Sequence, residues 1–244
     1  MTRTNTLIIY VCLLLLGLSR TMEIYAGDTF YAQTQEGITL RFGVLDEQEK
    51  TAEVSAVDIN TPAMDSAVKG KVTIPSEVNG YKVTRIGDAA FSDCSMDSVI
   101  ISEGVESIGK FAFSGCGNIS YVSIPSTIKT LERFAFAIGP SLRSFVSYIE
   151  NPQGVINEDV FDEQISVDSK QRRIPDYEPS WSIGTYEDAT LYVPKGSIKL
   201  YQEDRFWGFF SNIKEQNPYD LDGDGTLTLN DITTLINIYL EKSE

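Results

Sequence analysis

The 244-residue sequence contains no histidine and only three cysteines, and its 20 Lys and Arg are outnumbered by 35 Asp and Glu. Histidine is the commonest general base and metal ligand at neutral pH, so its absence excludes Ser-His and Cys-His nucleophile systems and His-ligated zinc within this chain. A net charge of −15 repels phosphate backbones and argues against nucleic acid as a partner. Carboxylate chemistry remains, but no motif singles out a catalytic Asp or Glu pair, and we therefore expect no enzyme.

The sequence also lacks an apolar run of the roughly 20 residues that cross a bilayer comfortably. A shorter run, from Leu7 to Leu18, follows Arg3 and is followed by a small residue at Ala26. This order predicts a signal peptide over residues 1–26, whose removal would also remove Cys12. We therefore expect an exported protein, secreted or at the cell surface, with no membrane span after signal removal.

The middle of the chain repeats itself at a fixed step. Phe91, Phe113 and Phe136 are 22 and 23 residues apart, and each follows an alanine. Other apolar positions keep the same step: Val83, Val105 and Ile128; Val99 and Val122; Ile101 and Ile124. A period in the twenties is typical of a solenoid whose turns bury their core only against each other. The three phenylalanines should therefore stack in register in a shared interior.

Within one unit, residues 121–124 (Tyr-Val-Ser-Ile) alternate like a short strand, which Pro125 ends because proline cannot donate to a ladder. The pattern Ile-Pro-x-x-Val-x-x-Ile-Gly-x-x-Ala-Phe-x-x-Cys resembles the BspA-type leucine-rich repeats of exported bacterial proteins, over about residues 69–150. Residues 150–161 look like a degraded last turn, and residues 189–213 resemble the closing segment that often follows such repeats. The resemblance implies a curved solenoid with a strand-lined binding face and no catalytic residues.

The expected fold is mostly β: a leucine-rich-repeat solenoid of about three clear repeats plus a degenerate one, with N- and C-terminal caps and a short C-terminal helix after a calcium loop. The expected divisions are a signal peptide (1–26), a strand-rich N-terminal cap (27–68), the repeats (69–162), a loop and C-terminal cap (163–217) and a calcium-loop segment (218–244).

Two groups of side chains allow two interpretations each. Cys94 and Cys116 are 22 residues apart, so stacking places them within reach of a disulfide, but a buried ladder position also suits free thiols, which we favour. Aromatic residues near the C-terminus could form a sugar-stacking platform or close the open end of the solenoid. We expect Tyr192, Tyr201 and Trp207 to close it, and Trp181 to be exposed in a loop.

A calcium loop of twelve positions is predicted at residues 220–231. Gly225 allows the sharp turn at position 6, and four carboxylates in so short a loop repel each other unless a hard divalent cation joins them. The expected Ca²⁺ ligands are Asp220, Asp222, Asp224, Thr226, Thr228 and Asp231. Thr226 would bind through its backbone carbonyl and Thr228 through a water molecule.

The segment after this loop has an apolar helical face formed by Ile232, Leu235, Ile236, Tyr239 and Leu240. A loop of this type followed by such a helix resembles a dockerin repeat, here in a single copy, as a half EF-hand over 218–244. The resemblance implies a cohesin-like partner, although an apolar residue, Leu229, occupies a position that the family uses to recognise that partner. The apolar face docks either on the protein's own cap or on another protein.

Two functions fit these patterns. The first is a secreted or surface-attached, non-enzymatic binding or adhesion module, whose solenoid face recognises a protein or glycan ligand at a host or bacterial surface and whose calcium-ordered end adds an interaction segment. The second is an accessory subunit of a polysaccharide-degrading assembly, attached to a scaffold through the dockerin-like repeat.

Overall fold

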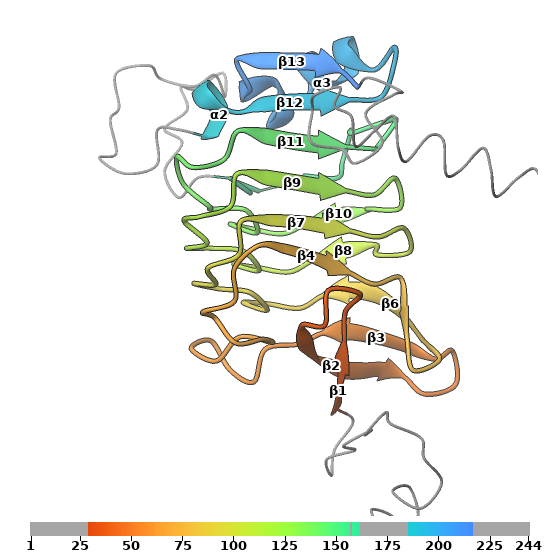
Figure 1. The fold of residues 1–244 in the computed structure, drawn as a ribbon. Helices are drawn as coiled ribbons and strands as arrows, with labels where there is room; N and C mark the ends of the chain where they lie inside the picture. Colours follow the sequence, from red (N-terminus) through yellow and green to blue (C-terminus); the bar gives the residue numbers. More distant parts are fainter. Residues whose placement is uncertain (1–28, 157, 162–184, 217–244) are drawn as a thin grey trace, which may run out of the picture.

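The computed structural model describes residues 29–156, 158–161 and 185–216. These residues wind into a stack of turns with one parallel sheet along the front of Figure 1 and a second sheet behind it. The front sheet, called the large sheet below, has the strand order β13-β12-β11-β9-β7-β4. Its strands in chain order are β4 (Lys71–Ile74), β7 (Ser98–Ile101), β9 (Tyr121–Ile124), β11 (Ser144–Ser147), β12 (Thr190–Val193) and β13 (Asn212–Glu215).

The second sheet has the order β1-β2-β3-β6-β8-β10, with β5 paired to β6. It begins as an antiparallel hairpin and becomes parallel from β3 onward. Its strands are β1 (Thr29–Gln33), β2 (Thr39–Asp46), β3 (Thr51–Val54), β5 (Glu77–Val78), β6 (Tyr81–Ile86), β8 (Ser107–Ile108) and β10 (Thr130–Leu131). Two short helices, α2 (Thr185–Asp188) and α3 (Ile198–Glu203), and the 3₁₀ turn η1 (Trp207–Phe209) lie near the C-terminal end of the stack. The expectation of a mostly β solenoid is confirmed.

The core is built from columns of equivalent side chains. In the large sheet the register aligns Val72, Val99, Val122, Phe145 and Leu191, all of which are completely buried. The strands are four residues long, and their alternation turns every second side chain inward. The 22–23-residue step therefore places like residues side by side, which is what a solenoid needs to bury a shared core.

The phenylalanine ladder predicted from the repeat is confirmed. The ring centroids of Phe91 and Phe113 are 5.0 Å apart and those of Phe113 and Phe136 are 5.2 Å apart, with the planes within 5° of parallel. The degraded last turn continues the ladder, because Phe161 stacks on Phe136 at 6.0 Å. Alanine precedes the first three rings because backbones meet there: the Phe113 N–H donates to the Ala135 carbonyl at 2.8 Å.

Cys94 and Cys116 are free, buried thiols, as favoured above. The Cys116 Sγ lies 2.9 Å from the Phe91 carbonyl oxygen, within the hydrogen-bonding distance of a thiol donor. Burial raises the pKa of the Cys94 thiol to about 12, and it raises the pKa of Cys116 as well. Both side chains therefore remain protonated at neutral pH and act as small core residues.

The tip of the β1–β2 hairpin covers the outer edge of β4, the end strand of the large sheet. The Glu36 carboxylate accepts hydrogen bonds from the Thr73 backbone N–H at 3.3 Å and the Thr73 hydroxyl at 2.6 Å. The Lys71 Nζ lies 3.8 Å from the same carboxylate. An open sheet edge is a template for unwanted strand pairing, and Glu36 occupies this one.

Glu36 is expected to make stability depend on pH in the acid range. Burial raises the pKa of this carboxyl, but hydrogen bonds from Thr73, Gln35 and Thr34 outweigh burial and lower the pKa from 4.5 to about 2. Because the folded-state pKa is the lower one, the contribution is present above pH 4.5 and is lost as the pH falls towards 2. Glu36→Gln should lower the unfolding free energy by about 1 kcal/mol at pH 7, measured by chemical denaturation. A difference between the two proteins that does not shrink over this acid range would contradict the assignment.

The C-terminal end of the core is closed by aromatic side chains. Tyr201 and Trp207 are completely buried, as expected for capping residues. The Tyr201 hydroxyl donates to the Ile149 carbonyl at 2.8 Å and is 2.6 Å from the Ser147 hydroxyl, which ties α3 to the end of β11. Tyr192 differs from the expectation: it lies half-buried on the solvent side of β12, because its neighbours Leu191 and Val193 take the inward positions.

Candidate binding face

The side chains of the large sheet that point away from the core form two parallel columns, which we call the outward face. The register of the strands aligns them one above another at the strand spacing of about 4.8 Å. The first column is Lys71, Ser98, Tyr121, Ser144, Thr190 and Asn212. The second column is Thr73, Ile100, Ser123, Val146, Tyr192 and Lys214.

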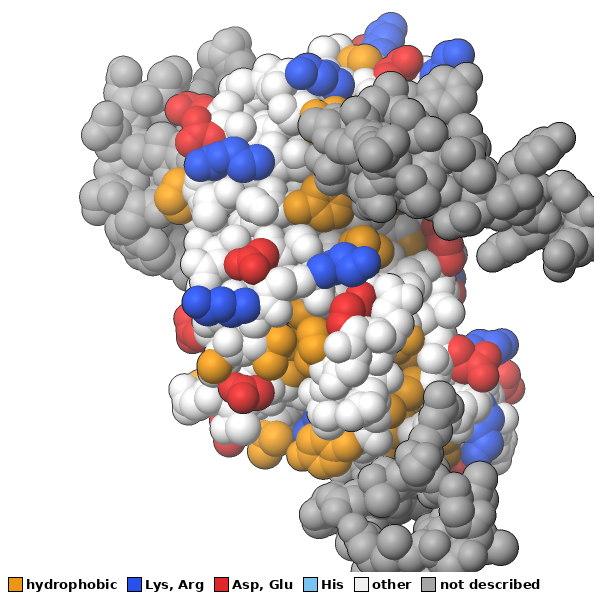
Figure 2. Space-filling model, in the orientation of Figure 1, with side chains coloured by type: hydrophobic (Ala, Val, Ile, Leu, Met, Phe, Trp, Pro, Cys, Tyr) orange, Lys and Arg blue, Asp and Glu red, His pale blue; other side chains and the backbone are white. Residues whose placement is uncertain are grey.

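The central part of the outward face carries no charge. On β7, β9, β11 and β12 all eight outward positions are Ser, Thr, Tyr, Ile or Val, and charged residues occur only on the end strands, as Lys71 and Lys214. Figure 2 views the molecule from this side and shows charged side chains scattered around apolar ones. In a chain of net charge −15, a strip four strands wide without Asp or Glu is a compositional feature typical of the core of a protein interface.

Two tyrosines supply the largest side chains of this strip. Tyr121 on β9 and Tyr192 on β12 are both half-buried, and the hydroxyl oxygen of Tyr121 is itself buried. Between them, Ser123 and Val146 are 6% and 3% exposed. Tyrosine combines a large apolar surface with a polar hydroxyl, which suits it to contact both protein and sugar ligands. The strip can therefore bind a ligand by packing and hydrogen bonding without a charged anchor.

The second sheet carries a different kind of surface, dominated by an ion cluster. Arg85 lies 2.7 Å from Asp88, 3.3 Å from Glu132 and 3.6 Å from Glu53. Burial raises the pKa of Glu53, and the nearby Arg85 opposes that shift. The guanidinium is already surrounded by carboxylates from β3 and from the segments that follow β6 and β10, so this cluster is suited to joining successive turns rather than to binding a ligand.

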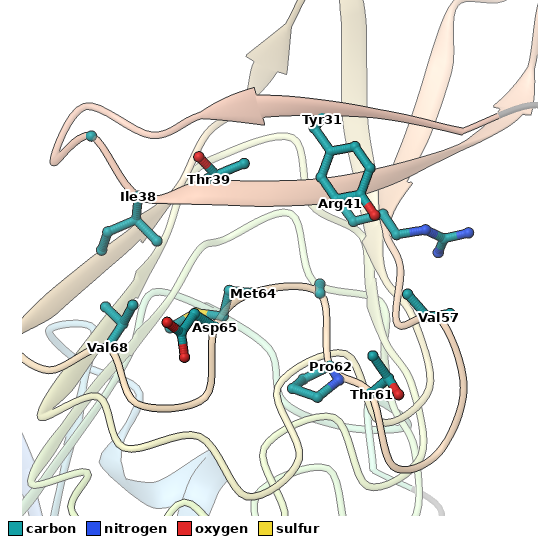
Figure 3. Close-up of a pocket in the computed structure, with 12 residues that line it drawn as sticks. Tyr31, Ile38, Thr39, Arg41, Val57, Thr61, Pro62, Met64, Asp65 and Val68 are labelled. Atoms are coloured by element: carbon teal, nitrogen blue, oxygen red, sulfur yellow. The ribbon is translucent and has the colours of Figure 1, made fainter. Parts of the chain in front are cut away.

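A pocket opens between the β1–β2 hairpin and the segment 57–68 (Figure 3). Its volume is about 450 Å³, and its lining is mainly apolar, including Tyr31, Ile38, Met64 and Val68. Arg41 contributes to the wall, but its Nη1 already donates to the Ser55 and Ala56 carbonyls at 3.0 and 2.6 Å. Sequence reasoning missed this pocket because its walls come from segments that share no repeat or motif.

Several residues singled out from the sequence lie outside the described residues. They include Trp181 and all six expected calcium ligands, Asp220, Asp222, Asp224, Thr226, Thr228 and Asp231. Within the described ranges, no group of three or more Cys, Asp or Glu is arranged to hold a metal ion. The helices described here include none long and apolar enough to cross a membrane.

Among known protein families, residues 67–175 match the model for the BspA type leucine rich repeat region, in six copies. The model counts more repeats than the three clear ones and one degenerate one that the sequence pattern predicts. None of the curated proteins matches the chain.

Three solved structures illustrate the similarity. The T. pallidum leucine rich repeat protein is 20% identical, with a TM-score of 0.38, over 48% of this chain and 53% of that chain. A leucine-rich repeat protein from Bacteroides capillosus is 22% identical, with a TM-score of 0.35, over 59% of this chain and 100% of that chain. A leucine rich cell surface protein from Faecalibacterium prausnitzii is 18% identical, with a TM-score of 0.39, over 82% of this chain and 41% of that chain. The chain thus spans about half the length of the first of these proteins. The stacked register of the strands agrees with this match of residues 67–175 to the BspA-type leucine-rich repeat region.

Proposed function

We propose that this chain is an exported, non-enzymatic binding or adhesion module, secreted or held at the cell surface, which binds its ligand on the outward face of the large sheet. The uncharged strip over β7, β9, β11 and β12 is the observation that carries the proposal, because the rest of the chain is strongly acidic. The ligand would be a protein or a glycan at a host or bacterial surface. Such a ligand would pack on Tyr121 and Tyr192 and form hydrogen bonds with the neighbouring hydroxyls.

Removing both tyrosines is expected to weaken ligand binding at least tenfold, because buried aromatic anchors contribute most of the energy of an interface. The measurement is binding of Tyr121→Ala/Tyr192→Ala to an array of matrix proteins and glycans, followed by titration of each hit. Ser107→Ala/Thr130→Ala is the matched control, since these residues face outward from β8 and β10 of the other sheet. Equal loss in both variants, or in neither, would exclude the outward face as the binding site.

We further propose that residues 220–231 bind one Ca²⁺ ion. The support is the sequence alone: carboxylates at positions 1, 3, 5 and 12 of the loop, with Gly225 at position 6. Titration of the mature chain, followed by calorimetry, should show one site with a dissociation constant of about 10⁻⁴–10⁻³ M, as for other extracellular sites. Asp220→Ala/Asp224→Ala should abolish it, whereas Asp188→Ala, at an exposed position in α2, should not. Unchanged binding by the double variant would refute the loop.

A second function is favoured by the dockerin-like sequence over residues 218–244. In that case the chain would be an accessory subunit of a polysaccharide-degrading assembly, attached through a cohesin-like partner. Capture of the full chain by cohesin modules in calcium, lost in a chelator and on deletion of 218–244, would support it. Capture that persists after the deletion would assign the contact to the solenoid instead.

A further inference from the structure

Two residues on the outward face are buried although strand alternation turns them away from the core. Ser123 on β9 and Val146 on β11 are neighbours in register, and they are 6% and 3% exposed. The outward residues beside them in the same column, Ile100 and Tyr192, are only half-buried. The centre of the strip is therefore its most enclosed point, and a segment that covers it must lie over β9 and β11.

The chain leaves the described structure close to this point. The Gln216 backbone N–H donates to the Val193 carbonyl at 2.8 Å, and its side-chain Nε2 donates to the Ser147 carbonyl at 2.7 Å. Ser147 ends β11, two strands away from β13, so Gln216 reaches back across the end of β12. Gln216, the last described residue of this part of the chain, therefore contacts the residue that follows Val146 on β11.

The segment beyond Gln216 has the length and the composition to cover the strip. Residues 217–230 can span up to roughly 46 Å when extended, whereas β13 and β9 are only about 14 Å apart. The sequence of 231–240 predicts a helix of about 15 Å, comparable to the distance from β7 to β12. Five of its six apolar residues lie on one helical face, and so short a helix needs a surface on which to pack.

We propose that residues 231–240 dock by their apolar face on the outward face of the large sheet, over Ser123 and Val146. The apolar helix face and the uncharged strip are chemically compatible, because docking would bury the apolar side chains of the helix without burying a charged group of the strip. If the outward face is also the ligand-binding site proposed above, residues 231–240 and an external ligand would compete for the same strip. This consequence rests on the proposed function. A charged partner would find no counter-charge on these four strands.

Thiol labelling of the mature chain, residues 27–244, which lacks Cys12, tests this contact without any ligand. Ser123→Cys introduces a reporter at the covered position, and the native Cys94 and Cys116 stay unreactive because they are buried with raised pKa values. Adding Leu235→Asp/Ile236→Asp should speed maleimide labelling of the reporter at least tenfold. Ser107→Cys on the opposite sheet is the matched control, and its labelling rate should not change.

Equal labelling rates of the Ser123→Cys reporter with and without the two aspartates would overturn the proposal. Residues 231–240 would then be expected to pack on another protein. Faster labelling of the Ser107→Cys control as well would mean that the aspartates had loosened the solenoid. Deletion of 217–244 then decides: selective exposure of the Ser123→Cys reporter supports docking, and protection that persists overturns it. Because no ligand is used, these outcomes are independent of whether the tyrosine variants lose binding, and the two proposals can fail separately.

Discussion

Replacing Phe113 with alanine is expected to lower the free energy of unfolding by about 3–5 kcal/mol. The ring is completely buried and is stacked between Phe91 and Phe136 at 5.0 and 5.2 Å. Its removal leaves a cavity in the middle of the ladder, and the turns above and below cannot close it because their backbones are joined by hydrogen bonds at Ala112 and Ala135. Chemical denaturation of the mature chain, followed by far-UV circular dichroism, measures the change.

Phe111→Ala is the matched control, from the same turn and two residues earlier. This side chain is 41% exposed and touches the ring of Phe134 at the surface, so its truncation should cost less than about 1 kcal/mol. Similar losses in the two variants would mean that the ladder does not carry the stability of the solenoid. A cost below about 1 kcal/mol for Phe113→Ala would place the ring outside the core.

Trp207→Ala is expected to cost a similar amount, about 3–5 kcal/mol, by opening the C-terminal end of the core. The indole is completely buried, and its ring lies 5.4 to 5.8 Å from those of Tyr201, Phe161 and Phe145. Its Nε1–H has no hydrogen-bond partner within the described part of the chain, so packing alone accounts for its contribution. The last turn of a solenoid has no following turn to cover it, and this side chain takes that place.

The control for Trp207→Ala is Leu200→Ala, in α3 of the same cap. Leu200 is 37% exposed, so its truncation should change the unfolding free energy by less than about 1 kcal/mol. Thermal unfolding of both variants by calorimetry provides the comparison. If Trp207→Ala unfolds like the control, the cap is not part of the cooperative core.

The interior of the solenoid could be predicted from the sequence because a constant repeat length determines which side chains of successive turns lie next to each other. Once each turn takes 22 or 23 residues, Phe91, Phe113 and Phe136 must meet, and the structure brings their rings to about 5 Å. Even the irregular last turn could be recognised, since Phe161 continues the ladder. Stacking one turn on the next repeats the same local geometry, so a one-dimensional pattern suffices.

The surfaces were less predictable, because they depend on which side of a strand faces the core. Tyr192 was expected in the C-terminal cap, but the pairing of β12 with β11 turns Leu191 and Val193 inward and leaves the tyrosine outside. Strand alternation is visible in a sequence, but the side that becomes buried is decided by the neighbouring strand.

The sequence by itself determined the repeat, the ladder, the free thiols favoured at Cys94 and Cys116 and the absence of histidine chemistry. The tertiary structure alone decided the uncharged outward face and the closure of the β4 edge by Glu36, which binds Thr73 from 37 residues away. The physical reason is the range of the interactions. Core contacts recur at the period of the chain, whereas the hairpin clasp and the columns of the large sheet arise only when separate segments are brought side by side.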